Sequence, residues 1–213
     1  MIHNTRVDAS FGKAHSGASS MPTMRLRLDK RRISVSVMDQ TADKVFEYCP
    51  KCGSPEFTSL RRDLFVCKQC GFHYHINAAA ASGVLFYDGA GRVLFTLRAK
   101  DPAKGKLGLP GGFIDLGETA EDGLRREIRE EIGIEVGAMN YIGSFPNTYP
   151  YKGLTYRTLD LFFESKWDAQ QVEIDLDEVD GLVWEDPFTL DSDRIAFESM
   201  RQALSRWKSM HLR

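Results

Sequence analysis

Residues 111–134, GGFIDLGETAEDGLRREIREEIGI, constrain the fold more than any other segment. After Thr119, apolar residues recur every four positions, which indicates an amphipathic helix over 119–132 with one buried stripe. Thr119 can cap the start of this helix, and Gly133 can end it. Three glutamates share the neighbouring stripe: Glu127, Glu130 and Glu131. The segment therefore joins a diglycine turn to a helix that carries both a buried face and a cluster of carboxylates.

This cluster has two interpretations, a solvated acidic face and a metal site. Two carboxylates at i and i+4 repel by roughly 0.2–0.5 kcal/mol on an open helix. In a cleft with an effective dielectric near 20, charges about 5 Å apart repel by about 3 kcal/mol. A hard divalent cation relieves this repulsion, and such cations take oxygen ligands. The energetics favour the metal site.

The spacing of the fixed residues resembles the signature of the Nudix hydrolases. Gly112, five residues, Glu118, seven residues, and the run REIREEIGI from Arg126 to Ile134 fit every position of that signature. With background frequencies near one in ten to twenty, a chance match is on the order of one in 10^8 per window. The resemblance implies an α/β fold, an α/β/α sandwich with a mixed sheet, over residues 78–213.

The resemblance also implies an activity. Nudix hydrolases cleave a nucleoside diphosphate linked to another moiety at the pyrophosphate, with Mg²⁺ or Mn²⁺. The metal ligands carried over to this chain are Glu127, Glu130, Glu131 and the carbonyl of Gly111. Arg126 would orient a carboxylate of the cluster, and Glu118 would support the metal–water network. The general base varies within the family; Glu178 is our first candidate, with Asp177 and Glu173 as rivals, and an ordinary acidic loop residue is the alternative for each.

Four cysteines form two matched pairs, Cys49-Pro-Lys-Cys52 and Cys67-Lys-Gln-Cys70, separated by 14 residues. A glycine follows each pair and allows the tight turn that points backbone amides at sulfur. Four thiolates suit tetrahedral zinc with no open position, so the pattern predicts a structural zinc site in a ribbon over residues 46–77. The chain begins without the apolar core of a secretory signal, which favours a reducing cytoplasm over disulfides. His73 and His75 are expected in the strand that leaves the ribbon, and replacement of a cysteine by one of them is the alternative.

The remaining chain predicts a leader followed by elements of the larger domain. Residues 1–45 show no clear period and are expected to be a partly flexible leader with a short strand over 31–38. A hairpin is expected over 82–99 and a closing helix over 193–207. Further strands are expected over 141–145, 154–164 and 179–184. The 28 basic residues are balanced by 30 acidic ones, so nucleic acid is an unfavoured partner, though not an excluded one. No apolar run is long enough for a membrane span.

The segment PNTYPYKGLTY, residues 146–156, is interpreted as a substrate-binding loop between two strands. Its two prolines reduce the entropy lost on binding. Phe145, Tyr149 or Tyr151 would stack on a base, and Lys152 would reach a phosphate. Packing at a sheet edge or a dimer interface is the alternative for each ring, and a homodimer is left open.

A four-cysteine ribbon directly before the Nudix signature resembles the NADH pyrophosphatases, which also cleave NAD caps from RNA. Those enzymes carry SQPWPFPxS after the signature, whereas this chain has SFPNTYPY at 144–151, and only about 45 residues precede its ribbon. We therefore expect ADP-ribose or a similar nucleoside diphosphate sugar as the small-molecule substrate, with NADH, NAD or NAD-capped RNA as the alternative. A non-catalytic ligand sensor whose ribbon binds nucleic acid or protein is a further alternative, which the intact signature disfavours.

Overall fold

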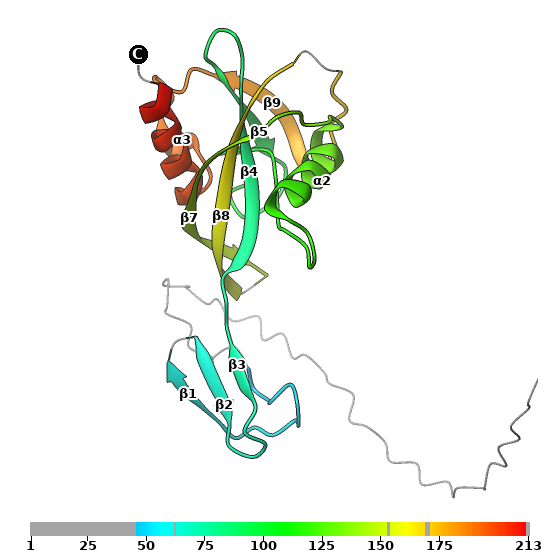
Figure 1. The fold of residues 1–213 in the computed structure, drawn as a ribbon, viewed down its shortest axis with the longest axis vertical. Helices are drawn as coiled ribbons and strands as arrows, with labels where there is room; N and C mark the ends of the chain where they lie inside the picture. The colour runs from blue at the N-terminus through cyan, green and yellow to red at the C-terminus, as the bar shows by residue number, and fades with distance from the viewer. Residues whose placement is uncertain (1–45, 62, 153, 169–170, 212–213) are drawn as a thin grey trace, which may run out of the picture. The chain divides into compact units, whose positions relative to one another are not determined.

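The computed structural model describes residues 46–211, except 62, 153 and 169–170. The leader expected over 1–45 and its strand at 31–38 lie outside these residues. The described chain contains a three-stranded sheet followed by a six-stranded sheet (Figure 1).

The three-stranded sheet is small and antiparallel. Its strands, in the order β1-β2-β3, are β1 (Phe57–Arg61), β2 (Leu64–Cys67) and β3 (His73–His75). The ring of Phe65 is fully buried and lies 5.4 Å from that of Phe46 and 5.1 Å from that of Phe57. His73 and His75 lie on β3, as expected, and both are exposed. One buried phenylalanine makes a minimal core, so this module needs a further source of stability.

The six-stranded sheet is mixed. Its strands are β4 (Ala79–Tyr87), β5 (Val93–Arg98), β6 (Leu107–Gly108), β7 (Asn140–Tyr151), β8 (Leu154–Lys166) and β9 (Val179–Glu185). The order is β6-β5-β4-β8-β7, and β9 pairs with β5. The β4–β8 pair is parallel and the other pairs are antiparallel. The hairpin expected over 82–99 is formed by β4 and β5, and Asp88 closes its turn by accepting the backbone N–H groups of Ala90 and Arg92.

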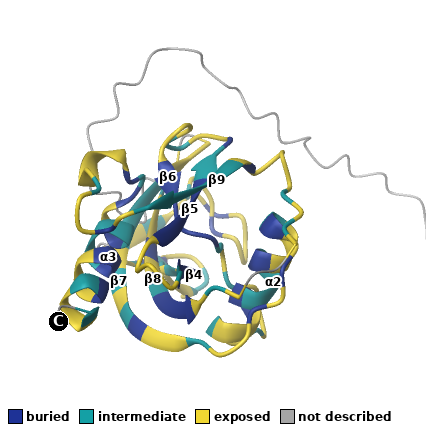
Figure 2. Ribbon diagram, turned by 90° about the horizontal axis from the view of Figure 1, so that it is seen from above, coloured by how far each residue is buried: buried dark blue, intermediate teal, exposed yellow. Residues whose placement is uncertain are grey.

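Two helices cover opposite faces of this sheet (Figures 1 and 2). They are α2 (Ala120–Ile132) and α3 (Glu198–His211). Neighbouring residues of one strand divide between the two cores, because side chains alternate across a strand. On β8, Phe163 packs in the core that contains the apolar stripe of α2, whereas Phe162 packs in the core that contains Trp207 of α3. The α/β/α sandwich expected from the resemblance is therefore confirmed.

The closing helix begins later than expected. Residues Ser192–Arg194 form a short 3-10 helix, and α3 starts only at Glu198. The side chain of Asp191 accepts the N–H of Asp193, and Ile195 is extended (φ −81°, ψ 134°). Residue 195 bridges to Leu107, so β6 takes the backbone of this segment and the helix cannot include it.

The segment expected to be a loop at 146–156 is instead part of two long strands. Pro146 pairs with Leu159, and Tyr149 pairs with Tyr156. The prolines are tolerated because β7 is the edge strand of the sheet, where a missing N–H breaks no ladder bond on the open side. The aromatic residues are therefore held on a sheet rather than on a free loop.

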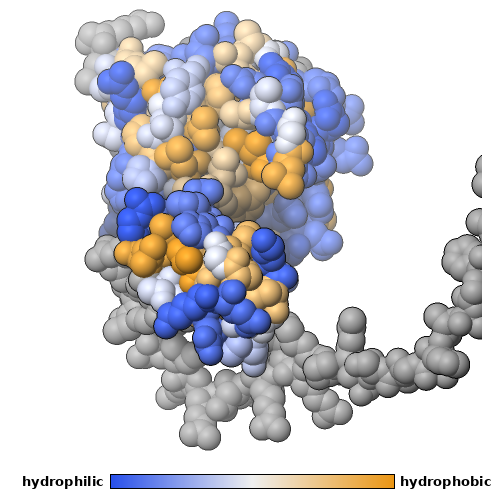
Figure 3. Space-filling view, turned by 60° about the horizontal axis from the view of Figure 1, so that its bottom comes forward, coloured by the Kyte–Doolittle hydropathy of each residue, from blue (hydrophilic) through white to orange (hydrophobic). Residues whose placement is uncertain are grey.

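None of the helices within the described ranges is long and apolar enough to cross a membrane. Hydrophobic side chains on the face drawn in Figure 3 are interspersed with hydrophilic ones.

Candidate functional site

A cleft of about 440 Å³ brings together most of the predicted site residues. It lies against the sheet, between the diglycine turn, α2 and the inner side of the β7–β8 hairpin. The predicted residues that line it are Gly111, Glu127, Glu131, Glu178, Tyr149 and Tyr151.

The diglycine turn fits closely against both the sheet and the helix. The N–H of Gly111 donates to Oε2 of Glu131 at 2.9 Å. Gly111 has φ of 128°, and a Cβ there would collide with the backbone of Ser82. A Cβ on Gly112 would lie 2.5 Å from the carboxylate of Glu127. Glycine is required at Gly111 because φ is positive and the turn approaches the backbone of β4 this closely, whereas a side chain at Gly112 would displace the carboxylate of Glu127.

Helix α2 is anchored independently of its acidic cluster. Thr119 caps the first turn and Gly133 adopts the left-handed conformation (φ 69°) at the end, as expected. Leu124, Ile128 and Ile132 are completely buried. Each contributes roughly 1.5–3 kcal/mol by burial, which exceeds the repulsion of roughly 0.2–0.5 kcal/mol per carboxylate pair on the helix. The hydrophobic core therefore holds the carboxylates together.

Arg126 ties the loop before α2 to the acidic face. Its Nε and Nη2 donate to the two carboxylate oxygens of Glu118 at 2.8 and 3.0 Å. Its Nη1 donates to Glu127 at 2.9 Å and to Glu130 at 3.1 Å, while Nη2 also reaches the carbonyl of Phe113. Hydrogen bonds from Arg126 lower the pKa of Glu118 to about 2. These contacts support the expected positioning role of Arg126 and make Glu118 the anchor of that arginine.

The carboxylates in the cleft are electrostatically crowded. Burial, reinforced by the charges of Glu127 and Glu178, raises the pKa of Glu131 to about 8, although the Gly111 N–H and Arg98 oppose the shift. Burial also raises the pKa of Glu127, with Glu178 again contributing. A cation between these oxygens would favour their charged forms. The donor set, which consists of carboxylates beside a carbonyl-bearing turn, fits a hard divalent ion.

The cleft does not contain every predicted acid. Glu130 is 61% exposed in its side chain and pairs with Arg126, and it does not line the cleft. Among the three base candidates, Glu178 lines the cleft and the other two, Asp177 and Glu173, do not. The structure thus favours Glu178 over its rivals.

Of the aromatic residues predicted to bind substrate on β7, two line the cleft and one does not. Tyr149 and Tyr151 line the cleft. Phe145 is half-buried and packs against Phe162 in the core, 6.2 Å between ring centroids. Lys152 is exposed, and its Nζ lies 4.9 Å from the centre of the Tyr151 ring. Phe145 and Lys152 are therefore not among the residues that line the cleft.

Several residues that line the cleft were not singled out from the sequence. They are Arg98, Lys100, Phe113, Thr158, Asp160 and Phe197. The guanidinium of Arg98 is fixed by the carbonyl of Pro102 at 2.9 Å and by the ring of Phe197, 5.0 Å away. Asp160 carried a usable signal, because alternation along LDLFF places it on the inward side with Phe162, where an acid is unusual. Arg98 carried none, since a cation at the end of a strand is usually solvated.

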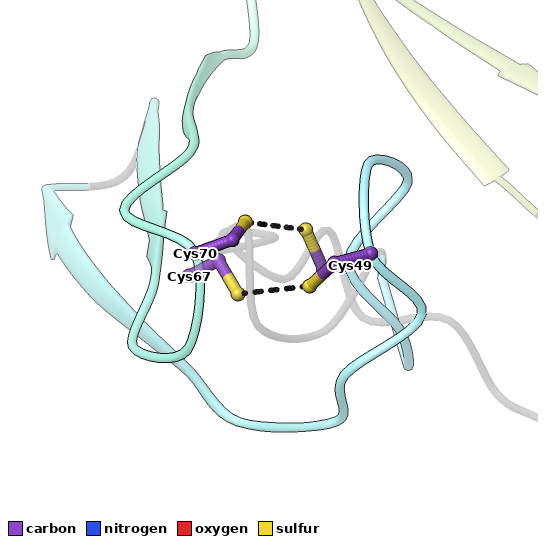
Figure 4. Close-up of side chains that lie close together, drawn as sticks. Cys49, Cys67 and Cys70 are labelled. Atoms are coloured by element: carbon purple, nitrogen blue, oxygen red, sulfur yellow. Dashed lines mark hydrogen bonds between the residues drawn. The ribbon is translucent and has the colours of Figure 1, made fainter.

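The four cysteines converge in the small module. Their sulfur atoms all lie within 4.8 Å of one another. Cys49 and Cys70 are 3.9 Å apart, and Cys52 and Cys67 are 3.6 Å apart, with the two turns facing each other (Figure 4). Zn–S bonds of about 2.3 Å at tetrahedral angles require S···S distances of about 3.8 Å. The observed spacings fit that requirement.

The surroundings of the four thiols shift the pKa of Cys67 and the pKa of Cys52 in opposite directions. Hydrogen bonding from the backbone of Cys70 lowers the pKa of Cys67 to about 7 against the effect of burial. The pKa of Cys52 is raised to about 12: a backbone hydrogen bond at Ser54 lowers it, but desolvation and the three neighbouring thiols outweigh this effect. Four thiolates this close need a cation between them. The cluster is thus a candidate zinc site.

Comparisons with known proteins agree with this geometry. The chain is 29% identical over 147 residues to the NAD-capped RNA hydrolase NudC of Pseudomonas aeruginosa. The matched region covers 68% of this chain and 48% of that protein. It is 27% identical to the human mitochondrial NAD(P)H pyrophosphatase NUDT13, over 65% of this chain and 38% of that protein. The chain thus spans about half, or less, of the length of these curated relatives.

A solved structure shows the same fold. The Nudix hydrolase from Nitrosomonas europaea superposes with a TM-score of 0.58 at 20% identity, over 78% of this chain and 92% of that one. The NUDIX domain family matches residues 77–206, more than half of the chain and all of the cleft described above. The protein therefore belongs to the NUDIX domain family.

Proposed function

We propose that this protein hydrolyses a nucleoside diphosphate linked to another moiety, at the pyrophosphate, in a reaction that depends on Mg²⁺ or Mn²⁺. One observation supports it most: Glu127, Glu131 and Glu178 line the same cleft as an aromatic wall containing Tyr149. An anion-neutralising centre and a base-sized apolar surface within one cleft match the two halves of a nucleotide.

The divalent metal would be held by Glu127, Glu131 and the carbonyl of Gly111, with Glu130 as a further ligand. It would supply charge neutralisation to the diphosphate and acidify water. Glu178 accepts the proton of the attacking water, since it lines the cleft beside the cluster. Arg98, already held by Pro102 and Phe197, binds a phosphate oxygen without losing further side-chain freedom. Zn²⁺ in the four-cysteine cluster has a structural role, and the four free thiols accord with the cytoplasm.

ADP-ribose or a similar nucleoside diphosphate sugar is the first candidate substrate. NADH or NAD, free or as an RNA cap, is the second, and the names of the two relatives favour it. Both candidates contain adenosine diphosphate, so the cleft needs the same features for either. They differ in the group beyond the second phosphate.

A substrate panel tests the proposal. The full chain, loaded with zinc, is assayed with ADP-ribose, NADH, NAD, other nucleotide sugars, dinucleoside polyphosphates and nucleoside triphosphates, with Mg²⁺ or Mn²⁺. We expect metal-dependent release of AMP together with ribose 5-phosphate from ADP-ribose, or with reduced nicotinamide mononucleotide from NADH. If no compound of the panel is hydrolysed but one of them binds tightly, the protein is a ligand sensor rather than a hydrolase.

A further inference from the structure

The cleft contains two buried polar side chains that the hydrolytic chemistry does not use. Thr158 and Asp160 lie two residues apart on β8, so both side chains point to the same face of the sheet. They are 4% and 8% exposed, and both line the cleft. Burying a carboxylate or a hydroxyl is costly unless it has hydrogen-bond partners.

The partners that the protein supplies are incomplete. Ser199 of α3, itself completely buried, donates its hydroxyl to Oδ2 of Asp160 at 2.6 Å. In the part of the chain that the structure describes, no lysine or arginine pairs with this carboxylate. The hydroxyl of Thr158 is buried without a hydrogen-bond partner there. An acceptor fixed by Ser199 and an unpartnered hydroxyl are therefore presented to the cleft.

The distance from this pair to the glutamate cluster suits a nucleoside. Asp160 pairs with Ala81 of β4, and Ala81 bridges to Phe113, the residue after Gly112. Asp160 is thus two strand spacings, roughly 10 Å, from the diglycine turn. A diphosphate at the glutamates places its nucleoside over Asp160. Tyr149 provides an aromatic wall there, with its ring 5.4 Å from that of Phe197.

The chemistry of the pair restricts the base. An ionised carboxylate accepts hydrogen bonds and does not donate them. A base that presents an amino group satisfies it, whereas a base that presents a carbonyl leaves two acceptors facing each other in a buried site. Sites built to bond a polar group discriminate strongly against analogues that lack it.

We propose that Asp160, held by Ser199 and assisted by Thr158, selects a nucleobase by its exocyclic amino group. This inference rests on the proposed function for the placement of the diphosphate. Asp160 and Thr158 contact the base, and Ser199 is a positioning residue that acts through Asp160. Adenine and guanine both carry the required amino group, at different ring positions, and hypoxanthine lacks it.

Binding of AMP, GMP and IMP to the full chain, measured by calorimetry without added divalent metal, tests the inference. Inosine carries a carbonyl in place of the 6-amino group of adenosine and lacks the 2-amino group of guanosine, so IMP is the control for both. We expect AMP or GMP to bind about 10- to 100-fold more tightly than IMP, the range for a hydrogen bond to a charged group. The preferred base identifies which amino group is read. Equal affinities for all three would overturn the inference.

Variants show whether Asp160 is responsible. Asp160→Asn keeps the shape and adds a donor, so the preference over IMP should fall to about onefold or reverse. Glu164→Gln is the matched control: it alters another buried acid of β8, outside the cleft, and should keep the full preference. If Asp160→Asn is folded and keeps that preference, the inference fails. Ser199→Ala, which retains the carboxylate, should reduce the preference several-fold, and an unchanged preference there would remove the positioning role.

These outcomes are separable from failure of the proposed function. Monophosphate binding requires no hydrolysis, so the base preference is measurable even if the panel shows no turnover. In the opposite case, equal kcat/KM for ADP-ribose, GDP-ribose and their inosine analogue would leave the hydrolase intact and overturn only the base selection. If a ribose hydroxyl rather than the base donates to Asp160, kcat/KM should likewise be equal for substrates that differ only in the base.

Discussion

The two candidate metal sites of this protein are built in opposite ways. In the ribbon, four thiols converge from two tight turns, and the hydrophobic core of this module contains little more than Phe65. In the cleft, carboxylates project from a helix that the hydrophobic core already holds through Leu124, Ile128 and Ile132. We therefore expect the ribbon to need its proposed zinc in order to fold, whereas the cleft has its own core and its proposed metal would serve the chemistry.

The two sites also differ in whether their metal coordination leaves a position open for substrate. Four thiolates close a tetrahedral shell and leave no position for substrate. The acidic cluster opens into a cleft of about 440 Å³, which leaves room for water and a diphosphate. Losing the metal should unfold one region and only inactivate the other. The following predictions test that contrast.

The largest effect is expected from loss of zinc. The purified protein should contain about one zinc per chain, and Cys67→Ser or Cys70→Ser should remove it. Structural zinc contributes about 10–16 kcal/mol to the folding of small metal-dependent modules, so the ribbon should lose its structure and the protein its solubility. Metal analysis and solubility measure this.

His73→Ala is the control for the zinc prediction. His73 is exposed on β3 and is not part of the cysteine cluster, so zinc content should not change. Zinc-free wild-type protein, prepared without chelators, would contradict the prediction. Turnover in the soluble fraction of the cysteine variants should persist, because the cleft has its own core.

Glu131→Gln should abolish most activity while leaving the fold intact. The variant keeps the shape of the side chain and its hydrogen bond from Gly111, but it removes a metal-binding charge. We expect turnover to fall by about 10²- to 10⁴-fold, with an unchanged or higher melting temperature. Glu130→Gln should also lose activity, and comparing the two variants shows whether the exposed glutamate is a true ligand.

Glu121→Gln, which alters an exposed acid in the first turn of the same helix, is the matched control and should retain activity. Near wild-type turnover in both the Glu130 and Glu131 variants would mean that the cluster is only a solvated acidic face.

Tyr149→Ala should weaken substrate binding more than it slows the chemical step. Stacking on a base contributes about 1–3 kcal/mol, so KM should rise about 10-fold while kcat changes little. Phe145→Ala is the contrasting variant, since this ring packs in the core and should affect stability instead. Unchanged KM in both Tyr149→Ala and Tyr151→Ala would assign these rings a structural role.

The smallest effect concerns the pH dependence of stability. The pKa of Glu131 is raised from 4.5 to about 8, so between those values the folded protein holds a proton that the unfolded chain has lost. Stability of the protein without Mg²⁺ should therefore fall as pH rises from about 5 to about 8. Glu131→Gln removes this dependence, so its gain in Tm over the wild type should be larger at pH 8 than at pH 5.

Thermal unfolding at pH 5 and pH 8, with zinc content checked, measures this difference. Added Mg²⁺ should stabilise the wild type more at pH 8 than at pH 5, because binding requires the ionised carboxylate. A Glu131→Gln gain that is equal at both pH values would contradict the raised pKa.

Local patterns in the sequence were sufficient wherever the determinants are close in the chain. The α2 stripe follows from helical spacing, and its Thr119 cap and Gly133 end follow from residue type; all three were confirmed. The paired CxxC turns likewise predicted that four sulfurs would meet. The family and the sandwich fold followed from the spacing around Glu118 and Arg126.

Tertiary structure decided what depends on pairing between distant segments. Residues 146–156 contain two prolines and read as a loop, but β8 pairs with them because an edge strand tolerates proline. The start of α3 was set by the bridge between Ile195 and Leu107. Alternation along β8 signals that Asp160 faces inward, but its hydrogen bond from Ser199 was beyond the sequence, because the two residues are 39 positions apart. Helical and turn geometry act over a few residues, whereas burial and cross-strand contacts are fixed only when the whole sheet has formed.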